Sequence, residues 1–117
     1  LPLDSNTGWP DGPATVFADL RAAKLNPDGA VTAAAGQLWI ACWGAGCVIC
    51  LDPQGTEVNR LSLPAQQPTC PAFGGADLTD LLVTSAHIGF NDPDAAQGAT
   101  FCLPDTAQGL PEPRVVL

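Results

Sequence analysis

The sequence predicts an all-β protein built from propeller blades, and three observations support this prediction. Short apolar stretches of four to six residues recur along the chain, and most contain β-branched or aromatic residues, as strands do. Glycine and proline, 12 of each, separate these stretches with turn chemistry. The pattern also repeats: Pro68 follows Pro27 by 41 positions, and Leu81 follows Leu38 by 43. A repeat of about 40 to 45 residues that holds four strands is typical of propeller blades.

The expected strands are short and evenly spread. In chain order they are Leu1–Leu3, Ala14–Phe17, Leu38–Cys42, Cys47–Leu51, Val58–Leu63, Leu81–Ser85, Ala99–Leu103 and Arg114–Leu117. Turns are expected at Asn26–Gly29, Asp52–Gly55 and Gly74–Gly75, where Pro, Asp and Gly cluster. Ala18–Leu25 and Val31–Ala35 have some helical character, but both are short and run into helix breakers, so no helix is predicted.

The repeat divides the chain into about two and a half blades of four-stranded antiparallel sheet. Residues 1–25 are expected to be outer strands of a preceding blade, residues 26–67 a complete blade, and residues 68–117 the last blade. Closed propellers contain about four to eight blades. The chain is therefore expected to be a single domain that is a fragment of a longer propeller.

The charge balance argues against several classes of partner. Acidic residues outnumber basic ones 12 to 4, for a formal charge of −8, and the basic residues are scattered. Such a chain cannot neutralise phosphates, so neither nucleic acid nor an anionic membrane surface is an expected partner. No apolar run is long enough for a membrane helix. The chain has no Met and no signal-peptide pattern, and its five cysteines are an odd number, so a cytoplasmic location is expected.

Several segments in series resemble the SMP-30/gluconolactonase/regucalcin family. Residues 26–55 read NPDGAVTAAAGQLWIACWGAGCVICLDPQG, and residues 68–78 read PTCPAFGGADL. They are followed by LVTSA at 82–86, GATF at 98–101 and GLPEP at 109–113. The order and spacing of these motifs resemble the family's pattern from about Phe17 to the end of the chain.

The resemblance implies a six-bladed propeller that hydrolyses sugar lactones with a divalent metal such as calcium, zinc or magnesium. In the family the metal is held by a Glu, an Asn and the Asp of the Pro-Asp-Gly motif. Only the Asp is matched here, as Asp28, and the other positions would lie before Leu1. The resemblance therefore implies the C-terminal part of a lactonase, with the missing N-terminal blades as a partner and a sugar lactone as substrate.

Asp28 is also a candidate on its own chemistry. Pro27 restricts φ and Gly29 permits a close backbone approach, so the turn could direct the carboxylate to the channel axis. There it could bind a hard cation and accept a proton from an attacking water. The alternative is an ordinary turn, in which Asp before Gly is favoured in any case.

The cysteines offer a second, weaker pattern. Cys47 and Cys50 have the C-x-x-C spacing of metal and redox sites, with Cys42 and Cys70 as possible further ligands. On a strand, however, residues three apart point to opposite faces. Packed neutral thiols are therefore expected.

The remaining candidates are expected to be ordinary surface or core residues. His87, the single histidine, is expected at the surface or a pocket rim, although Ser85 nearby leaves a base and nucleophile pair open. Asn91–Asp94 is expected to be a solvated loop rather than a calcium loop. Trp39 is expected to pack between blades, and Trp43 is a weak candidate for a substrate-binding platform.

Three hypotheses on function remain open from the sequence. The first is the C-terminal part of a metal-dependent lactonase, with Asp28 as metal ligand and general base. The second is a non-catalytic fragment or remnant with a structural or interaction role. The third is self-association, in which three chains of two blades each would place three Asp28 carboxylates around one axis.

Overall fold

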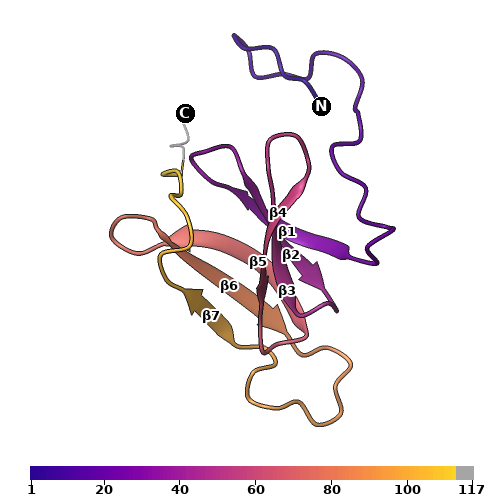
Figure 1. Cartoon of the computed structure of the whole chain (residues 1–117), viewed down its shortest axis with the longest axis vertical. Helices are drawn as coiled ribbons and strands as arrows, with labels where there is room; N and C mark the ends of the chain where they lie inside the picture. Colours follow the sequence, from indigo (N-terminus) through magenta and orange to yellow (C-terminus); the bar gives the residue numbers. More distant parts are fainter. Residues whose placement is uncertain (113–117) are drawn as a thin grey trace.

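The computed structural model describes residues 1–112, and in that part of the chain it contains strands and turns without helices. Seven strands form two antiparallel sheets that lie side by side (Figure 1). The first sheet has the order β1-β2-β3-β4 and the second β5-β6-β7. The strands are β1 (Asn26–Thr32), β2 (Leu38–Trp43), β3 (Cys47–Leu51), β4 (Glu57–Ser62), β5 (Gln67–Gly74), β6 (Asp80–Ala86) and β7 (Thr100–Leu103). The all-β prediction is confirmed.

The first sheet has four strands, and its middle strands are covered on both faces. Every residue of β3 is buried, as are Trp39 to Cys42 of β2, which explains why both segments are continuously apolar. β4 is mostly exposed, and only Leu61 is partly buried there. The change from buried apolar residues in β3 to exposed residues in β4 shows that β4 is an edge strand that faces solvent.

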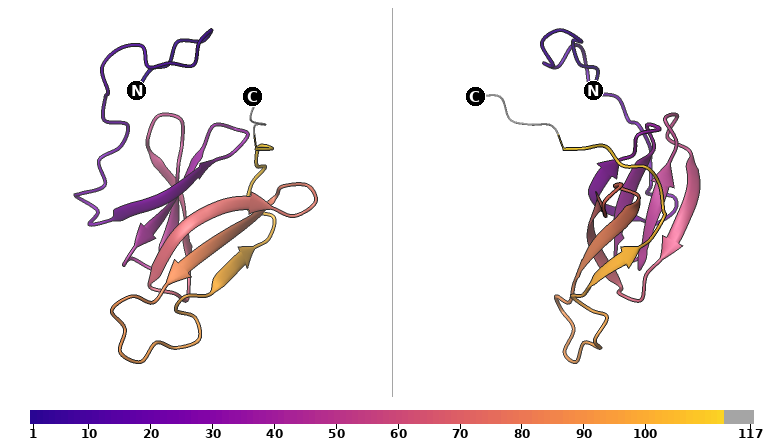
Figure 2. Two further views of the ribbon diagram at one scale, coloured as in Figure 1. Left: turned by 180° about the vertical axis from the view of Figure 1, so that it is seen from behind. Right: turned by 90° about the vertical axis from the view of Figure 1, so that its left-hand side faces the viewer.

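The second sheet has a covered face and an open face. Along β6, Leu81 and Val83 are fully buried, while Leu82 and Thr84, the residues that follow each of them, are exposed. This alternation is the period of two that a half-buried strand requires. The covered face packs against the first sheet, because β5 lies against β1 and β2 (Figure 2).

Two apolar clusters hold the molecule together. The cluster between the sheets contains Trp39, Val48 and Cys50 from the first sheet and Leu81 and Val83 from the second. The other cluster lies on the opposite face of the first sheet, where the segment that contains Ala18, Leu20 and Leu25 packs on the sheet. A hollow of about 530 Å³ separates part of this segment from the sheet. Both faces of the first sheet therefore contribute to the core.

The first strand of each sheet, β1 or β5, contains residues that the sequence analysis did not expect in a strand. These two strands are called the inner strands below. Asn26–Gly29, expected to be a turn, is the beginning of β1, and the strand β5 includes both Pro68 and Pro71. Proline is tolerated there because β1 and β5 are edge strands, in which an amide need not pair with a neighbour. Proline and glycine thus mark strand ends and irregularities here rather than chain reversals.

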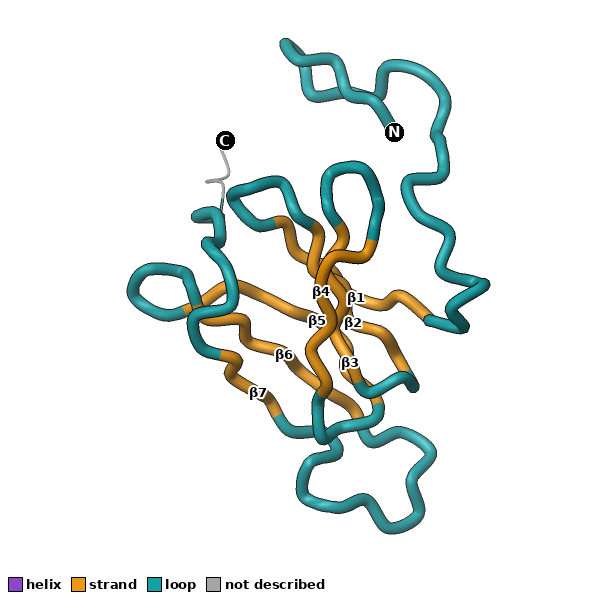
Figure 3. Tube along the Cα trace, in the orientation of Figure 1, coloured by secondary structure: helices purple, strands orange, loops and turns teal. Residues whose placement is uncertain are grey.

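The strands expected at Leu1–Leu3 and Ala14–Phe17 are not formed. Residues 1–25 have no regular structure beyond an isolated bridge between Leu3 and Pro10. The beginning of this segment extends away from the sheets (Figure 3), whereas Ala18, Leu20 and Leu25 pack on the first sheet without forming a strand. A strand needs a neighbour for its backbone groups, and no sheet edge of residues 26–112 pairs with this segment. Its assignment to a preceding blade stays a prediction. The strand expected at Arg114–Leu117 lies outside the described residues.

Within residues 1–112 no helix exists that could span a membrane.

Candidate functional site

A bulge in β1 sets the position of Asp28. Pro27 pairs with Cys42 and Ala30 with Ile40, so three steps along β1 match only two along β2. The extra residue lies at Asp28 and Gly29, and bulges of this kind redirect side chains and are frequent beside functional sites. Asp28 is exposed, and within residues 1–112 its carboxylate accepts no hydrogen bond. Its oxygens are accessible to a ligand from solvent.

A second bulge lies in β5, beside the first. Pro68 pairs with Ser85 and Cys70 with Thr84, so Thr69 is the extra residue of that strand. The backbone at Gly29 runs very close to this point. A Cβ atom at Gly29 would lie only 2.7 Å from both the carbonyl oxygen of Thr69 and the Sγ of Cys70. The irregular points of the two inner strands are therefore in direct contact.

Replacing Gly29 with Ala is expected to lower the free energy of unfolding by about 1–3 kcal/mol, the usual cost of overpacking. The Thr69 carbonyl belongs to the backbone and cannot rotate away from the new methyl group. Urea denaturation followed by circular dichroism measures the change. Gly74→Ala is the matched control, because its Cβ would meet only the flexible, partly exposed side chain of Leu82. Equal losses in the two variants would show that the close approach at Gly29 is unimportant.

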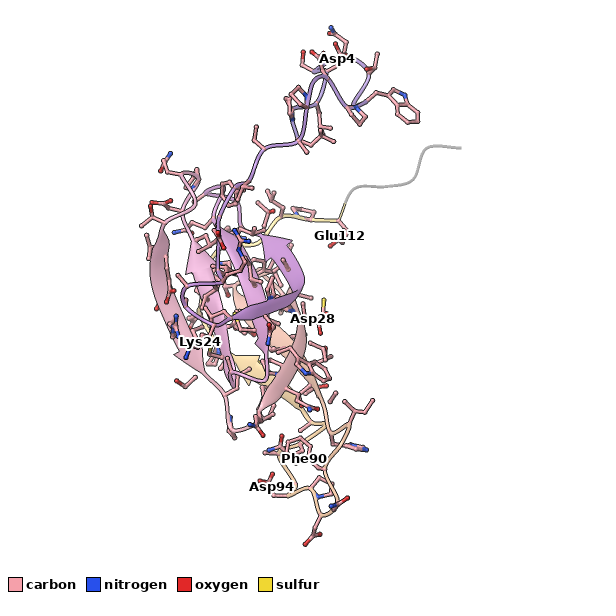
Figure 4. The ribbon with its side chains drawn as sticks, turned by 90° about the vertical axis from the view of Figure 1, so that its right-hand side faces the viewer. Asp4, Lys24, Asp28, Phe90, Asp94 and Glu112 are labelled. Carbon is pink, nitrogen blue, oxygen red and sulfur yellow. The ribbon has the colours of Figure 1, made fainter. Side chains whose placement is uncertain are left out.

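Asp28 is one suitable ligand for a hard cation, but the described residues do not complete a metal site. No three His, Cys, Asp or Glu residues of 1–112 are placed to hold one ion together. Figure 4 shows Asp28 at the inner strand, well away from Asp4 in the N-terminal segment, Asp94 in a distant loop and Glu112 near the C-terminus. The carboxylate fits the chemistry of such a site, which residues 1–112 alone would leave without its further ligands.

The two central tryptophans have different surroundings. Trp39 is 2% exposed and lies in the cluster between the sheets, as predicted. Trp43 ends β2, is half-buried and pairs with Asn26 at the start of β1. It therefore lies at the same end of the sheet as Asp28, which is compatible with its role as a candidate contact for a substrate. That role stays a prediction.

Within residues 1–112, the hydroxyl of Ser85 is hydrogen-bonded to backbone carbonyl oxygens and not to His87. His87 is exposed, and the Ser85 hydroxyl donates a 2.7 Å hydrogen bond to the carbonyl oxygen of Ala99. Ser85 thus fastens the loop between β6 and β7. In that loop Asn91–Asp94 is exposed, and the Asp94 carboxylate accepts a 2.8 Å bond from the amide of Ala96. This is local turn chemistry.

The cysteines separate as strand geometry requires. Cys47 lies in the cluster beneath the N-terminal segment, and Cys50 lies in the cluster between the sheets. The C-x-x-C spacing therefore does not bring its two thiols together. Cys42 instead lies directly opposite Cys47 on the neighbouring strand. Burial raises the pKa of Cys42 to about 11 and also raises the pKa of Cys50, so these thiols are neutral near pH 7.

Sequence comparison assigns the chain to a family. The family model that describes the SMP-30/Gluconolactonase/LRE-like region matches residues 1–87, which is most of the chain. The chain belongs to this family. It is 41% identical over 115 residues to a protein assigned as a sugar lactone lactonase in Rhizobium meliloti, an alignment that covers 95% of this chain. It is also 42% identical over 94 residues to a pentonolactonase of Haloferax volcanii, with 74% of this chain covered.

Solved structures of similar proteins support the same assignment and the propeller architecture. A calcium-binding regucalcin from Agrobacterium tumefaciens superposes with a TM-score of 0.90 at 43% identity and covers 99% of this chain. A luciferin-regenerating enzyme superposes with a TM-score of 0.75 at 20% identity, which indicates a shared fold. The two described sheets are thus neighbouring blades of a six-bladed propeller. The chain spans only about two fifths of its relatives: 39% of the Rhizobium protein and 41% of the regucalcin.

The sequence made Asp28 a candidate but did not indicate its neighbours on β5. Thr69 and Cys70 belong to a recognised motif, yet nothing local to that motif indicates contact with Gly29. The two segments are separated by about 40 positions, and only the packing of β5 on β1 brings them together. The blade repeat is the one signal that relates them, since Pro27 and Pro68 occupy equivalent positions in successive blades.

Proposed function

We propose that this chain is the C-terminal part of a metal-dependent sugar-lactone hydrolase, in which Asp28 is a metal ligand and general base. The support is the combination of an accessible carboxylate on a bulged inner strand with 41% identity, across 95% of the chain, to an assigned lactonase. The similarity to a calcium-binding regucalcin supports a divalent cation, for which calcium, zinc and magnesium are the candidates. A cytoplasmic location stays part of this proposal.

In the proposed reaction, Asp28 has one chemical task, which is to accept a proton from water. A bound divalent cation would polarise the lactone carbonyl. The Asp28 carboxylate accepts a proton from the attacking water, and the new bond joins the water oxygen to the carbonyl carbon. The bond from that carbon to the ring oxygen then breaks, and the ring oxygen takes up a proton. The product is an open-chain hydroxy acid, which releases a proton at neutral pH.

Local structure suits this role. The bulge removes Asp28 from the regular pairing of β1 with β2, and Gly29 allows β1 and β5 to approach closely beside it. Neither feature depends on the metal. The strand that carries the carboxylate is therefore in contact with both sheets. A rigid support of this kind is what a group needs if it must be positioned accurately.

The 117-residue chain alone is expected to show no lactone hydrolysis, because its described residues do not complete a metal site. The decisive experiment transfers this chain into the Rhizobium protein in place of the aligned 115 residues. Sugar γ- and δ-lactones are the substrates, and a pH indicator follows proton release. We expect the chimera to be active, to lose activity in EDTA, and to regain it with calcium, zinc or magnesium.

Two results would contradict the proposal. One is a folded chimera that is inactive with every one of these metals while the parent protein is active. The other is a parent protein that does not hydrolyse sugar lactones, since the relationship that supports the proposal would then indicate a different activity. Circular dichroism of the chimera distinguishes misfolding from loss of function. If the chimera is unfolded, the same exchange limited to residues 26–112 provides a smaller replacement with both blades intact.

A further inference from the structure

Cys42 and Cys47 face each other across the β2–β3 hairpin. They are direct partners in the pairing register, at the end of the hairpin next to its three-residue turn. Directly paired residues of antiparallel strands have Cα atoms about 4.5–5.5 Å apart. Disulfides span Cα separations of about 4.4–6.8 Å, so the backbone already has a suitable spacing.

The two thiols also share one environment. Both belong to the apolar cluster beneath the N-terminal segment, and paired side chains of this kind point to the same face of the sheet. The thiol of Cys47 is close enough to Cys42 to help raise the pKa of Cys42, although burial contributes more. Arg60, on the next strand, has the opposite influence on Cys42 and is held by a two-pronged ion pair with Glu57. All five cysteines are free thiols in this structure.

We propose that Cys42 and Cys47 are a redox-active dithiol that closes to a cross-strand disulfide when a hydroperoxide oxidises it. Cys47 is 4% exposed and Cys42 is not exposed, so Cys47 is the thiol that reacts first. Its sulfur attacks one peroxide oxygen, the O–O bond breaks, and hydroxide or alkoxide leaves and takes up a proton. Cys47 is then a sulfenic acid.

The second step closes the bond within the protein. The Cys42 sulfur attacks the sulfur of Cys47, the S–O bond breaks, and the departing hydroxide takes the Cys42 proton to form water. The two sulfurs together lose two electrons, which the peroxide gains. A small-molecule dithiol reverses the reaction by thiol–disulfide exchange. Because both sulfurs are buried, we expect oxidation to take minutes to hours rather than seconds.

This proposal is independent of lactone hydrolysis. The dithiol uses neither Asp28 nor a metal. Its position nevertheless has a structural consequence, because Cys42 also pairs with Pro27, the residue before Asp28. A disulfide would therefore link β2 to β3 one strand away from the bulge in β1.

The test begins with the reduced, folded 117-residue chain. Hydrogen peroxide is added under native conditions, and remaining thiols are alkylated with N-ethylmaleimide after denaturation. Intact mass spectrometry should then show the loss of two hydrogens and alkylation of every cysteine except one pair. Chymotrypsin cleaves after Trp43 and so places Cys42 and Cys47 on different peptides, which remain joined only through a disulfide. We expect a joined peptide that separates upon reduction.

Variants assign the bond. Cys50→Ala should leave the joined peptide unchanged, because Cys50 lies in the other cluster, whereas Cys42→Ala and Cys47→Ala should each abolish it. If a variant does not fold, fragmentation of the joined peptide from the unsubstituted chain still decides the matter, because N-ethylmaleimide then marks Cys50 and leaves Cys47 unmarked. The proposal is overturned if the oxidised wild-type chain keeps all five thiols, or if its disulfide joins a pair other than Cys42 and Cys47.

Discussion

Asp28→Asn in the Rhizobium chimera is expected to lower the kcat for lactone hydrolysis by roughly 100- to 10,000-fold, the contribution of a well-placed general base. Asn has nearly the same shape, so the bulge in β1 can persist. It has no negative charge for a cation and cannot accept the proton of an attacking water. The expected result is thus a folded protein with weak metal binding and very slow turnover, measured by proton release and by calorimetric metal titration.

The matched control is Asp94→Asn, which removes the same charge from the solvated loop between β6 and β7. Asp94 accepts only local hydrogen bonds, from Ala96 and Gln97, and Figure 4 shows it far from Asp28. We expect this variant to keep the kcat of the chimera. A folded Asp28→Asn chimera with undiminished kcat would eliminate Asp28 as the base. Undiminished metal affinity would eliminate it as a ligand.

Trp39→Ala is expected to lower the free energy of unfolding by about 3–5 kcal/mol. The side chain lies between the two sheets and contributes to the cluster that joins them. Its removal would leave a cavity that rigid strands on both sides cannot close. Since single domains are stable by only about 5–15 kcal/mol, much of the chain would unfold under mild conditions. Urea denaturation monitored by circular dichroism measures the loss without relying on tryptophan fluorescence.

Two further substitutions test whether the loss in stability comes from the packing of Trp39 between the sheets and not from the removal of any tryptophan. Trp9→Ala removes the same side chain at a position that is 74% exposed, and its effect should be within about 0.5 kcal/mol. Trp39→Phe retains most of the buried area and removes an indole N–H that has no partner within the described residues. It should cost clearly less than Trp39→Ala. Equal destabilisation by Trp9→Ala and Trp39→Ala would show that the inter-sheet cluster does not hold the blades together.

The predicted strands with regular apolar character agree well with the structure. Leu38–Cys42 and Cys47–Leu51 match β2 and β3 within one residue, because strands buried on both faces must be apolar throughout. Local sequence was misleading where proline occurs in edge strands, as at Asn26–Gly29. It was also misleading at Ala14–Phe17, which has strand-like composition but no neighbouring strand within residues 1–112. In both cases the outcome depends on which other backbone lies alongside.

The candidate site shows the same division. Asp28 could be selected as a candidate from its motif, because Pro27 restricts the local backbone and Gly29 permits a close approach. The contact of Gly29 with Thr69 and Cys70 could not, because β5 reaches this point only after an entire blade has been completed. The pairing of Cys42 with Cys47 was likewise obscured by the more familiar C-x-x-C spacing of Cys47 and Cys50. Strand register, which places the latter two on opposite faces, decided which thiols meet.

The sequence by itself determined the fold class, the blade repeat and the family resemblance, and it made Asp28 the candidate site residue, because these depend on periodicity and on residues adjacent in the chain. Only the tertiary structure decided that the first 25 residues remain outside the sheets, that bulges in β1 and β5 meet beside Asp28, and that Cys42 faces Cys47. The physical reason is that register and packing join residues distant in sequence. Their energies depend on the partner that each strand finds, which no single segment specifies.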